Sequence, residues 1–165
     1  MSYETTFEKL NAHGVKYLVV GGVAVNLWGA ARMTQDLDLV VDLSKRNLLA
    51  LVEAMNELGL RPRAPVEPSR LADASARKTW IDTKGMKAFS FFHPGDPFQV
   101  IDVLIADSRY KEFSRRSRIV MAGPVKVPLV SLDDLITMKT ESNRRQDQAD
   151  VETLRKIKSI LGERT

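Results

Sequence analysis

The chain of 165 residues has no cysteine and only two histidines. Without cysteine it forms no disulfide bond and no cysteine-ligated zinc site. His13 and His93 both lie in turn contexts, and they do not form a pair at the spacing of a metal site. Neither histidine is therefore expected to act as a metal ligand or as a general base.

Long apolar runs are also missing. No run is long enough to span a bilayer, and the first ten residues lack the apolar core of a signal peptide. These absences predict a cytoplasmic protein without a membrane partner. The apolar fraction of 44% is sufficient for a hydrophobic core, and the length predicts a single domain over residues 1–165.

The net charge of +4 is small, but the basic residues are unevenly distributed. They gather in two clusters: Arg61, Arg63, Arg70, Arg77, Lys78, Lys84 and Lys87, and then Arg109, Lys111, Arg115, Arg116 and Arg118. The clusters fit either solvated loops and helix faces or a rim for a nucleotide or an RNA backbone. Trp80 in the first cluster could stack on a base, although a single tryptophan near a strand is more typical of a core edge.

The most informative stretch, residues 17–42, reads as a buried strand, a Gly21-Gly22 turn, a short helix and a strand that opens with Asp36 and Asp38. Side chains two apart on a strand share a face, so the two carboxylates lie side by side and repel each other. Mg²⁺ held by carboxylates and by triphosphate oxygens relieves such repulsion. A diglycine turn that enters a helix lets backbone N–H groups approach phosphates.

This stretch resembles the head motif of the nucleotidyltransferase fold of the DNA polymerase beta superfamily. It is most similar to the minimal members grouped with the abortive-infection (type IV toxin-antitoxin) nucleotidyltransferase toxins. The family pattern of Gly-Gly or Gly-Ser, Arg-x-Thr/Ser and Asp-x-Asp is matched by Gly21, Gly22, Arg32, Thr34, Asp36 and Asp38. One departure is that neither glycine is the serine of better-known members, so a hydroxyl contact to phosphate is missing.

The resemblance implies an α/β (α+β) nucleotidyltransferase fold, in which helices flank a mixed β-sheet. It implies nucleotide binding through Gly21, Gly22, Arg32 and Thr34, with Asp36 and Asp38 as metal ligands. For Arg32 a second interpretation stays open, in which the guanidinium pairs with an inward acid such as Asp147 and fixes the loop before the second strand.

Asp102 is the candidate for a third acid. On the expected strand 98–105 it shares a face with Phe98, Val100 and Leu104, and an ionised carboxylate there needs a positive partner. In the resembled family a third acidic residue on a downstream strand completes the metal site. The alternative is that Asp102 lies at a sheet edge and pairs with an arginine.

The C-terminal segment 130–165 is expected to form a pair of helices packed on the domain. Lys139 interrupts an apolar stripe on the first of them, while Asp147 and Asp150 align with apolar residues of the second. The segment resembles the family ending Leu-x-x-Met-Lys … Arg-x-x-Asp-x-x-Asp, which implies that Lys139 contacts nucleotide phosphates and that both acids lie near the site. The alternative is a buried ion network of Lys139 or Arg144 with the two acids.

Periodicity and turn residues predict the other elements. Helices are expected over 3–12, 23–31 and 109–115, and between a Ser44 cap and Gly59. Strands are expected over 16–20, 36–41, 87–92 and 98–105, with short extended pieces at 118–121 and 125–128. Residues 61–84, with three prolines, are expected to form a loop and a short helix near 69–77.

Together these features predict a nucleotidyltransferase that moves NMP from an NTP to an acceptor hydroxyl and releases pyrophosphate. Two Mg²⁺ ions, or Mn²⁺, are expected on Asp36, Asp38 and Asp102, with Asp102 activating the acceptor hydroxyl. The sequence does not choose among tRNA, a protein and a small molecule as acceptor. The alternative is a catalytically silent relative that binds a nucleotide or an antitoxin-like partner protein.

Overall fold

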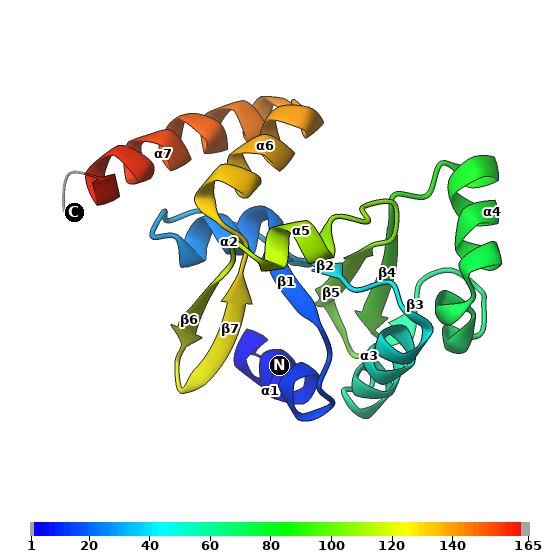
Figure 1. Cartoon of the computed structure of the whole chain (residues 1–165). Helices are drawn as coiled ribbons and strands as arrows, with labels where there is room; N and C mark the ends of the chain where they lie inside the picture. Colours follow the sequence, from blue (N-terminus) through cyan, green and yellow to red (C-terminus); the bar gives the residue numbers. More distant parts are fainter. Residues whose placement is uncertain (1, 163–165) are drawn as a thin grey trace.

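The centre of the fold is the antiparallel pair of β1 (Tyr17–Val20) and β2 (Asp36–Val41) in a computed structural model that describes residues 2–162. β2 pairs in parallel with β5 (Asp96–Leu104), and β1 pairs in parallel with β7 (Val125–Leu129). These four strands form the middle of one seven-stranded mixed sheet, with the order β3-β4-β5-β2-β1-β7-β6 (Figure 1). The expected mixed α/β architecture is confirmed.

Three further strands complete the sheet. β4 (Ala88–His93) forms a hairpin with β5, and β6 (Arg118–Ala122) forms one with β7. The two-residue strand β3 (Arg61–Pro62) adds to the free edge of β4, which the sequence did not predict. β5 also begins two residues earlier than expected, because its pairing with β4 continues into the turn.

Helices lie on both faces of the sheet. In chain order they are α1 (Tyr3–Ala12), α2 (Gly21–Leu27), α3 (Lys45–Glu57), α4 (Ala74–Lys84), α5 (Tyr110–Ser114), α6 (Leu132–Ser142) and α7 (Arg145–Gly162), with a 3-10 helix at Pro68–Ala72. Figure 1 shows the C-terminal pair α6 and α7 together on one side of the molecule, and α1 and α3 on the other. No helix among residues 2–162 is long and apolar enough to cross a membrane.

The face of the sheet opposite the paired aspartates carries most of the core. Leu37 and Leu39 of β2 are fully buried on this face. On the same face Tyr17, the β1 partner of Val41, stacks on Phe7 of α1 at 6.3 Å between ring centroids. Helices α1, α3 and α4 cover this face, so it is closed to ligands and the acid-bearing face is the one available for function.

Two helix predictions were wrong in their bounds. α2 begins at Gly21 itself and ends at Leu27, before the positive-φ residue Gly29. In the proline-rich stretch, the expected short helix is instead the 3-10 turn followed by the eleven-residue α4. Asp73 caps α4 by accepting hydrogen bonds from the backbone of Ser75 and Ala76, a start signal that the nearby prolines obscured.

Trp80 of α4 is 7% exposed and stacks on Phe89 at 5.4 Å. It therefore belongs to the core edge, and the idea that it stacks on a base is wrong. Ser44 and Ser131 are confirmed as the N-caps of α3 and α6, where their hydroxyls accept hydrogen bonds from the backbone N–H groups of the first turns.

Candidate active site

The sheet places three carboxylates on one face of neighbouring strands. Asp38 of β2 lies opposite Asp102 of β5 in the parallel register, and Asp36 lies two residues earlier on the same face of β2. On the other side of β5, Ser90 of β4 pairs with Asp102, and its hydroxyl donates a 2.5 Å hydrogen bond to Asp102 Oδ1. The structure therefore brings together the three acids that the sequence singled out.

Burial and neighbouring carboxylates raise the pKa of Asp38 and of Asp36. Burial, together with the charges of Asp102 and Asp36, raises the pKa of Asp38 from 3.8 to about 7, against the opposing charges of Lys139 and Arg144. Burial and Asp102 also raise the pKa of Asp36, which lies nearer to solvent, and Arg63 lowers it. In this arrangement the site has more negative charge than its neighbouring cations compensate, which favours binding of a cation.

The diglycine lies directly beside these acids. Gly21 has φ +66°, and a Cβ atom there would lie 2.8 Å from Asp38 Cγ, too close for any side chain. A Cβ atom on Gly22 would lie 2.6 Å from Thr34 Oγ1 and 3.3 Å from Arg32 Cζ. Glycine is thus required at both positions, by contacts with the other motif residues. The head motif is one compact cluster in space.

Two interpretations of Lys139 were open, a contact with nucleotide phosphates and a buried ion network with Asp147 and Asp150. The structure places Lys139 in the ion network. The side chain is 5% exposed, and its Nζ lies 3.1 Å from Asp147 Oδ1 and 2.9 Å from Asp150 Oδ2. Arg144 Nε donates a 2.9 Å hydrogen bond to Asp147 Oδ2. Hydrogen bonds from Arg144, Ser142 and Lys139 outweigh the effect of burial and hold the pKa of Asp147 well below its usual value.

Arg32 joins the same network from the loop before β2. Its guanidinium pairs with Asp150, whereas the sequence suggested Asp147 as an example of the partner. Its carbonyl accepts a 3.0 Å hydrogen bond from Asn26 of α2. The loop that leads into Asp36 is therefore tied to α7 through Arg32 and Asp150.

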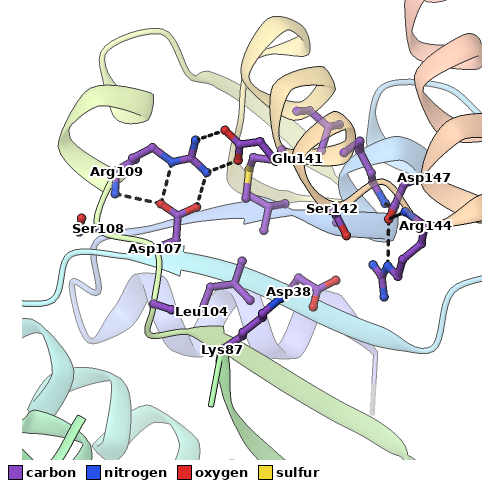
Figure 2. A pocket seen from close by; sticks show the side chains of 16 residues that line it. Asp38, Lys87, Leu104, Asp107, Ser108, Arg109, Glu141, Ser142, Arg144 and Asp147 are labelled. Carbon is purple, nitrogen blue, oxygen red and sulfur yellow. Dashed lines mark hydrogen bonds and ion pairs between the residues drawn. The ribbon is translucent and has the colours of Figure 1, made fainter. Parts of the chain in front are cut away.

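A cleft of about 930 Å³ opens beside Asp38, between the sheet and α6 (Figure 2). Gly21 and Asp38 lie at its base, Leu104 and Lys87 line the sheet side, and the α6 side includes Lys139. Arg144, at the start of α7, extends its guanidinium toward Asp38 in Figure 2. Positive side chains thus face the cleft at the end where the acids lie.

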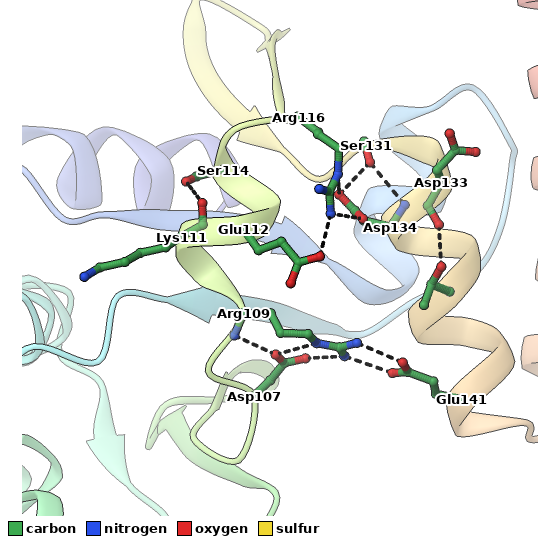
Figure 3. Close-up of polar contacts among 11 residues, drawn as sticks. Asp107, Arg109, Lys111, Glu112, Ser114, Arg116, Ser131, Asp133, Asp134 and Glu141 are labelled. Carbon is green, nitrogen blue, oxygen red and sulfur yellow. Dashed lines mark hydrogen bonds and ion pairs between the residues drawn. The ribbon is translucent and has the colours of Figure 1, made fainter.

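The far end of the cleft is closed by an ion cluster that the sequence did not reveal. Arg109 donates to both oxygens of Asp107, at 2.8 and 3.0 Å, and to both oxygens of Glu141, at 2.8 and 2.9 Å. A second arginine, Arg116, donates to both oxygens of Asp134 at the other end of α6 (Figure 3). The segment around α5 is therefore fastened to α6 at two points.

Two arginines of the second basic cluster, Arg109 and Arg116, and part of the first cluster thus have structural partners. Arg77 is buried and donates to the carbonyls of Leu71 and Leu43, and Lys78 pairs with Asp82. Ser90 and the Asp107–Arg109–Glu141 cluster were missed because each depends on a long-range pairing. The only sequence signal for Ser90 was one polar residue within the apolar run of β4.

No group of three acidic or histidine side chains within residues 2–162 is arranged as a ready-made metal cage. Mg²⁺ is commonly bound by one or two carboxylates together with substrate phosphates. Asp36, Asp38 and Asp102 all offer hard oxygen ligands, and the pKa values of Asp36 and Asp38 are raised. This donor chemistry fits an ion that arrives with a nucleotide.

The fold is similar to two solved nucleotidyltransferase structures. One is the lincosamide antibiotic adenylyltransferase LnuA with lincomycin bound, with a TM-score of 0.60 and 14% identity over 91% of this chain and 92% of that chain. The other is an antigenic nucleotidyltransferase-like protein from Paracoccidioides brasiliensis, with a TM-score of 0.57 and 16% identity over 94% of this chain and 76% of that chain. At these identities the likeness shows the fold alone.

No curated protein matches the sequence. A family model, in contrast, matches residues 4–161, which include the whole sheet, the acid row and most of α7. The chain therefore belongs to the family described as "Nucleotidyltransferase of unknown function (DUF6036)".

Proposed function

We propose that this chain is an active, Mg²⁺-dependent nucleotidyltransferase that transfers NMP from an NTP to an acceptor hydroxyl. The observation that carries the proposal is the row of Asp36, Asp38 and Asp102 on one face of the sheet, with Asp38 lining a cleft into which Lys139 and Arg144 also face. In the reaction, the acceptor oxygen forms a bond to the α-phosphorus, the bond between the α- and β-phosphates breaks, and pyrophosphate leaves.

Asp36, Asp38 and Asp102 would hold two Mg²⁺ ions, or Mn²⁺. When bound, the metal neutralises phosphate charge and orients the triphosphate for in-line attack. Three carboxylates repel one another less once a cation lies among them, so the raised pKa of Asp38 supports this assignment.

Other residues of the chain would position the nucleotide. The Gly21-Gly22 backbone leaves room beside Asp38, and Thr34 packs against Gly22. Lys139 and Arg144 supply positive charge to the cleft near Asp38. Arg32, which is held by Asp150, would act mainly by fixing the loop that presents Asp36. Asp147 and Asp150 support the site indirectly, because they hold the two cations.

Asp102 would accept the proton of the acceptor hydroxyl. Its partner Ser90 fixes the orientation of the carboxylate, and Asp102 lies on the β4 side of the row, away from the cleft that Asp38 lines. The nucleotide and the acceptor would therefore approach the acids from different sides.

The proposal is tested by Asp102→Asn. The variant should retain Mg²⁺-dependent binding of ATP, GTP, CTP or UTP, but transfer of the α-phosphate label should fall by about 10²- to 10⁴-fold, as expected for loss of a general base. Asp133→Asn, the same change at an exposed acid of α6, is the control. A transfer rate in Asp102→Asn comparable to that of the wild type would refute this role of the residue.

The name of one structural neighbour guides the choice of substrates. LnuA is described as an adenylyltransferase of a lincosamide antibiotic, so ATP is the first nucleotide to test, and small hydroxylated molecules belong among the acceptors together with tRNA and protein. That this chain works with an antitoxin-like partner in a toxin-antitoxin pair is a further proposal, and it rests only on the resemblance of the head motif. Co-expression with the product of the neighbouring gene tests it.

A second candidate function is a catalytically silent relative that binds nucleotide or a partner protein. The observation in its favour is that no three acids within residues 2–162 converge as a metal cage. Wild-type protein that binds Mg²⁺ and NTP but labels no tRNA, protein or small molecule would favour this second candidate.

A further inference from the structure

The acid-bearing face of the sheet continues beyond the three carboxylates onto β4 and β3. In the antiparallel register Arg61 lies opposite Phe92, and Phe92 lies opposite Val100, the partner of Asp36. The backbone N–H of Arg63 donates to the carbonyl of Ser90, the residue opposite Asp102. Both arginines therefore lie on the same face of the sheet as the acids. Across the strands, Arg61 is in line with Asp36, and Arg63 is in line with Asp102.

These two arginines differ from Arg77, Arg109 and Arg116, each of which has a structural partner. Arg61 and Arg63 are both exposed, and within residues 2–162 neither forms an ion pair. Arg63 nevertheless acts electrostatically on Asp36, whose pKa it lowers. An arginine pair held beside the site but free of carboxylate partners is suited to bind an external anion.

An exposed aromatic residue lies at the start of β5. Phe98 is 69% exposed, although it is a large apolar side chain, and it lies four residues before Asp102, in the irregular part of the β4–β5 pairing. Its backbone N–H donates a 3.1 Å hydrogen bond to Asp96, so the strand is ordered at this point. An exposed ring on an ordered strand provides a flat stacking surface.

The shape of this surface distinguishes it from the cleft. Small-molecule sites are usually concave and bury most of the ligand. Arg61, Arg63 and Phe98 are exposed residues of β3, of the segment after it and of the start of β5, and none of the three lines the cleft. Figure 1 shows β3 at the opposite end of the sheet from α6 and α7, which form the other wall of the site. An open, positive and aromatic surface fits an extended polyanion with flat bases.

We infer that Arg61, Arg63 and Phe98 form the acceptor surface of this enzyme, and that the acceptor is the end of a single-stranded nucleic acid. The arginines contact backbone phosphates, Phe98 stacks on a base, and the terminal ribose hydroxyl lies beside Asp102. The inference rests on the proposed function and names its acceptor class. Asp102 takes the hydroxyl proton, the oxygen bonds to the α-phosphorus, and pyrophosphate leaves, so the strand grows by one nucleotide.

Binding to fluorescein-labelled single-stranded RNA of about 12 nucleotides, a length within the range that single-strand sites cover, tests the inference by fluorescence anisotropy. The variants are Arg61→Gln with Arg63→Gln, and Phe98→Leu. The control is Lys45→Gln with Arg46→Gln, which removes the same charge from exposed positions of α3 on the opposite face. All five positions are exposed, so folding should be unaffected.

The two variants should weaken binding in different ways. Loss of two phosphate contacts should reduce the slope of log Kd against log salt concentration by about 1.4, since each contact to a single strand contributes about 0.7. Phe98→Leu keeps the charge, so it should leave the slope unchanged and weaken binding by about fivefold or more through lost stacking. The α3 control should keep most of the affinity and the slope.

Binding of Mg²⁺ and ATP, measured in parallel, separates the two proposals. Intact nucleotide binding in all variants, with the slope change confined to Arg61→Gln with Arg63→Gln, supports the acceptor surface. The inference is overturned if the RNA does not bind to the wild type, if the α3 control matches the arginine variant, or if transfer goes to a protein or small molecule instead. A wild type that fails to bind Mg²⁺ and ATP overturns the proposed function and the inference with it.

Discussion

Substitution of Gly21 by alanine is the most direct test of the geometry around the acids. The residue has φ +66°, which costs an L-amino acid about 1–2 kcal/mol. The new methyl group would also lie 2.8 Å from Asp38 Cγ and 2.9 Å from Asp38 Cβ, both inside van der Waals contact. The side chain of Asp38 must therefore leave its position, or β1 and β2 must separate.

The chain supplies a matched control for the backbone part of this cost. Gly14 has nearly the same φ, +64°, but a Cβ atom there would have no neighbour within 4 Å. The difference between Gly21→Ala and Gly14→Ala therefore isolates the clash with Asp38. Overpacking of this kind costs about 1–3 kcal/mol. At about 2–4 °C per kcal/mol for a chain of this size, Gly21→Ala should melt roughly 2–12 °C below Gly14→Ala.

Thermal unfolding followed by circular dichroism measures the stability difference, and calorimetric titration with ATP in excess Mg²⁺ measures binding. Gly14→Ala should bind like the wild type, whereas Gly21→Ala should lose Mg²⁺-dependent binding because Asp38 is displaced. If the two variants melt together and bind ATP equally well, the close approach of Gly21 to Asp38 does not organise the site, and the reasoning is refuted.

Three other measurements address the ionised groups. Because the pKa of Asp38 is about 7 in the fold, against 3.8 in a free chain, stability falls as the pH rises from about 4 to about 7. Asp38→Asn in EDTA should therefore melt well above the wild type at pH 8 and by a clearly smaller margin at pH 5. Equal effects at both pH values would contradict this. Lys139→Met removes the buried partner of Asp147 and Asp150 and should lower the free energy of unfolding by about 3 kcal/mol. A large loss of ATP affinity with an unchanged melting temperature would instead indicate a phosphate contact. The pKa of Asp147 is lowered in the fold, so the stabilisation by its carboxylate is present above about pH 4 and is lost as the pH falls. Asp147→Asn should therefore reduce the dependence of the melting temperature on pH between about pH 5 and 2. An unchanged dependence would contradict this role of Asp147.

The head motif was predictable from the sequence because its members meet through local structure. Asp36 and Asp38 share a face by strand periodicity, and Gly21 is placed by a single strand-to-helix turn. Asp102 was found in the same way, as a charge on an otherwise apolar strand face. Each of these predictions required only that the strands be located, and the alternation of apolar residues located them clearly.

The features that were missed depend on register between distant strands. Nothing local in Arg61 or Arg63 indicates that a two-residue strand will carry them to the acid face, because this needs the pairing of β3 with β4. Ser90 likewise becomes a partner of Asp102 only once β4 and β5 are aligned. For Lys139 both interpretations were open from the sequence, and the choice between them required the position of α7, which no periodicity specifies.

The link from Arg32 through Asp150 to Lys139 has a consequence for how this fold can vary. If α6 and α7 were removed, Arg32 would lose its counter-charge in a site where its side chain is only 18% exposed. The C-terminal helices and the loop before β2 should therefore unfold in one cooperative step, although they are more than a hundred residues apart in the chain. A chimera that exchanges the helical pair between relatives should be more stable when residues 28–35 are exchanged with it.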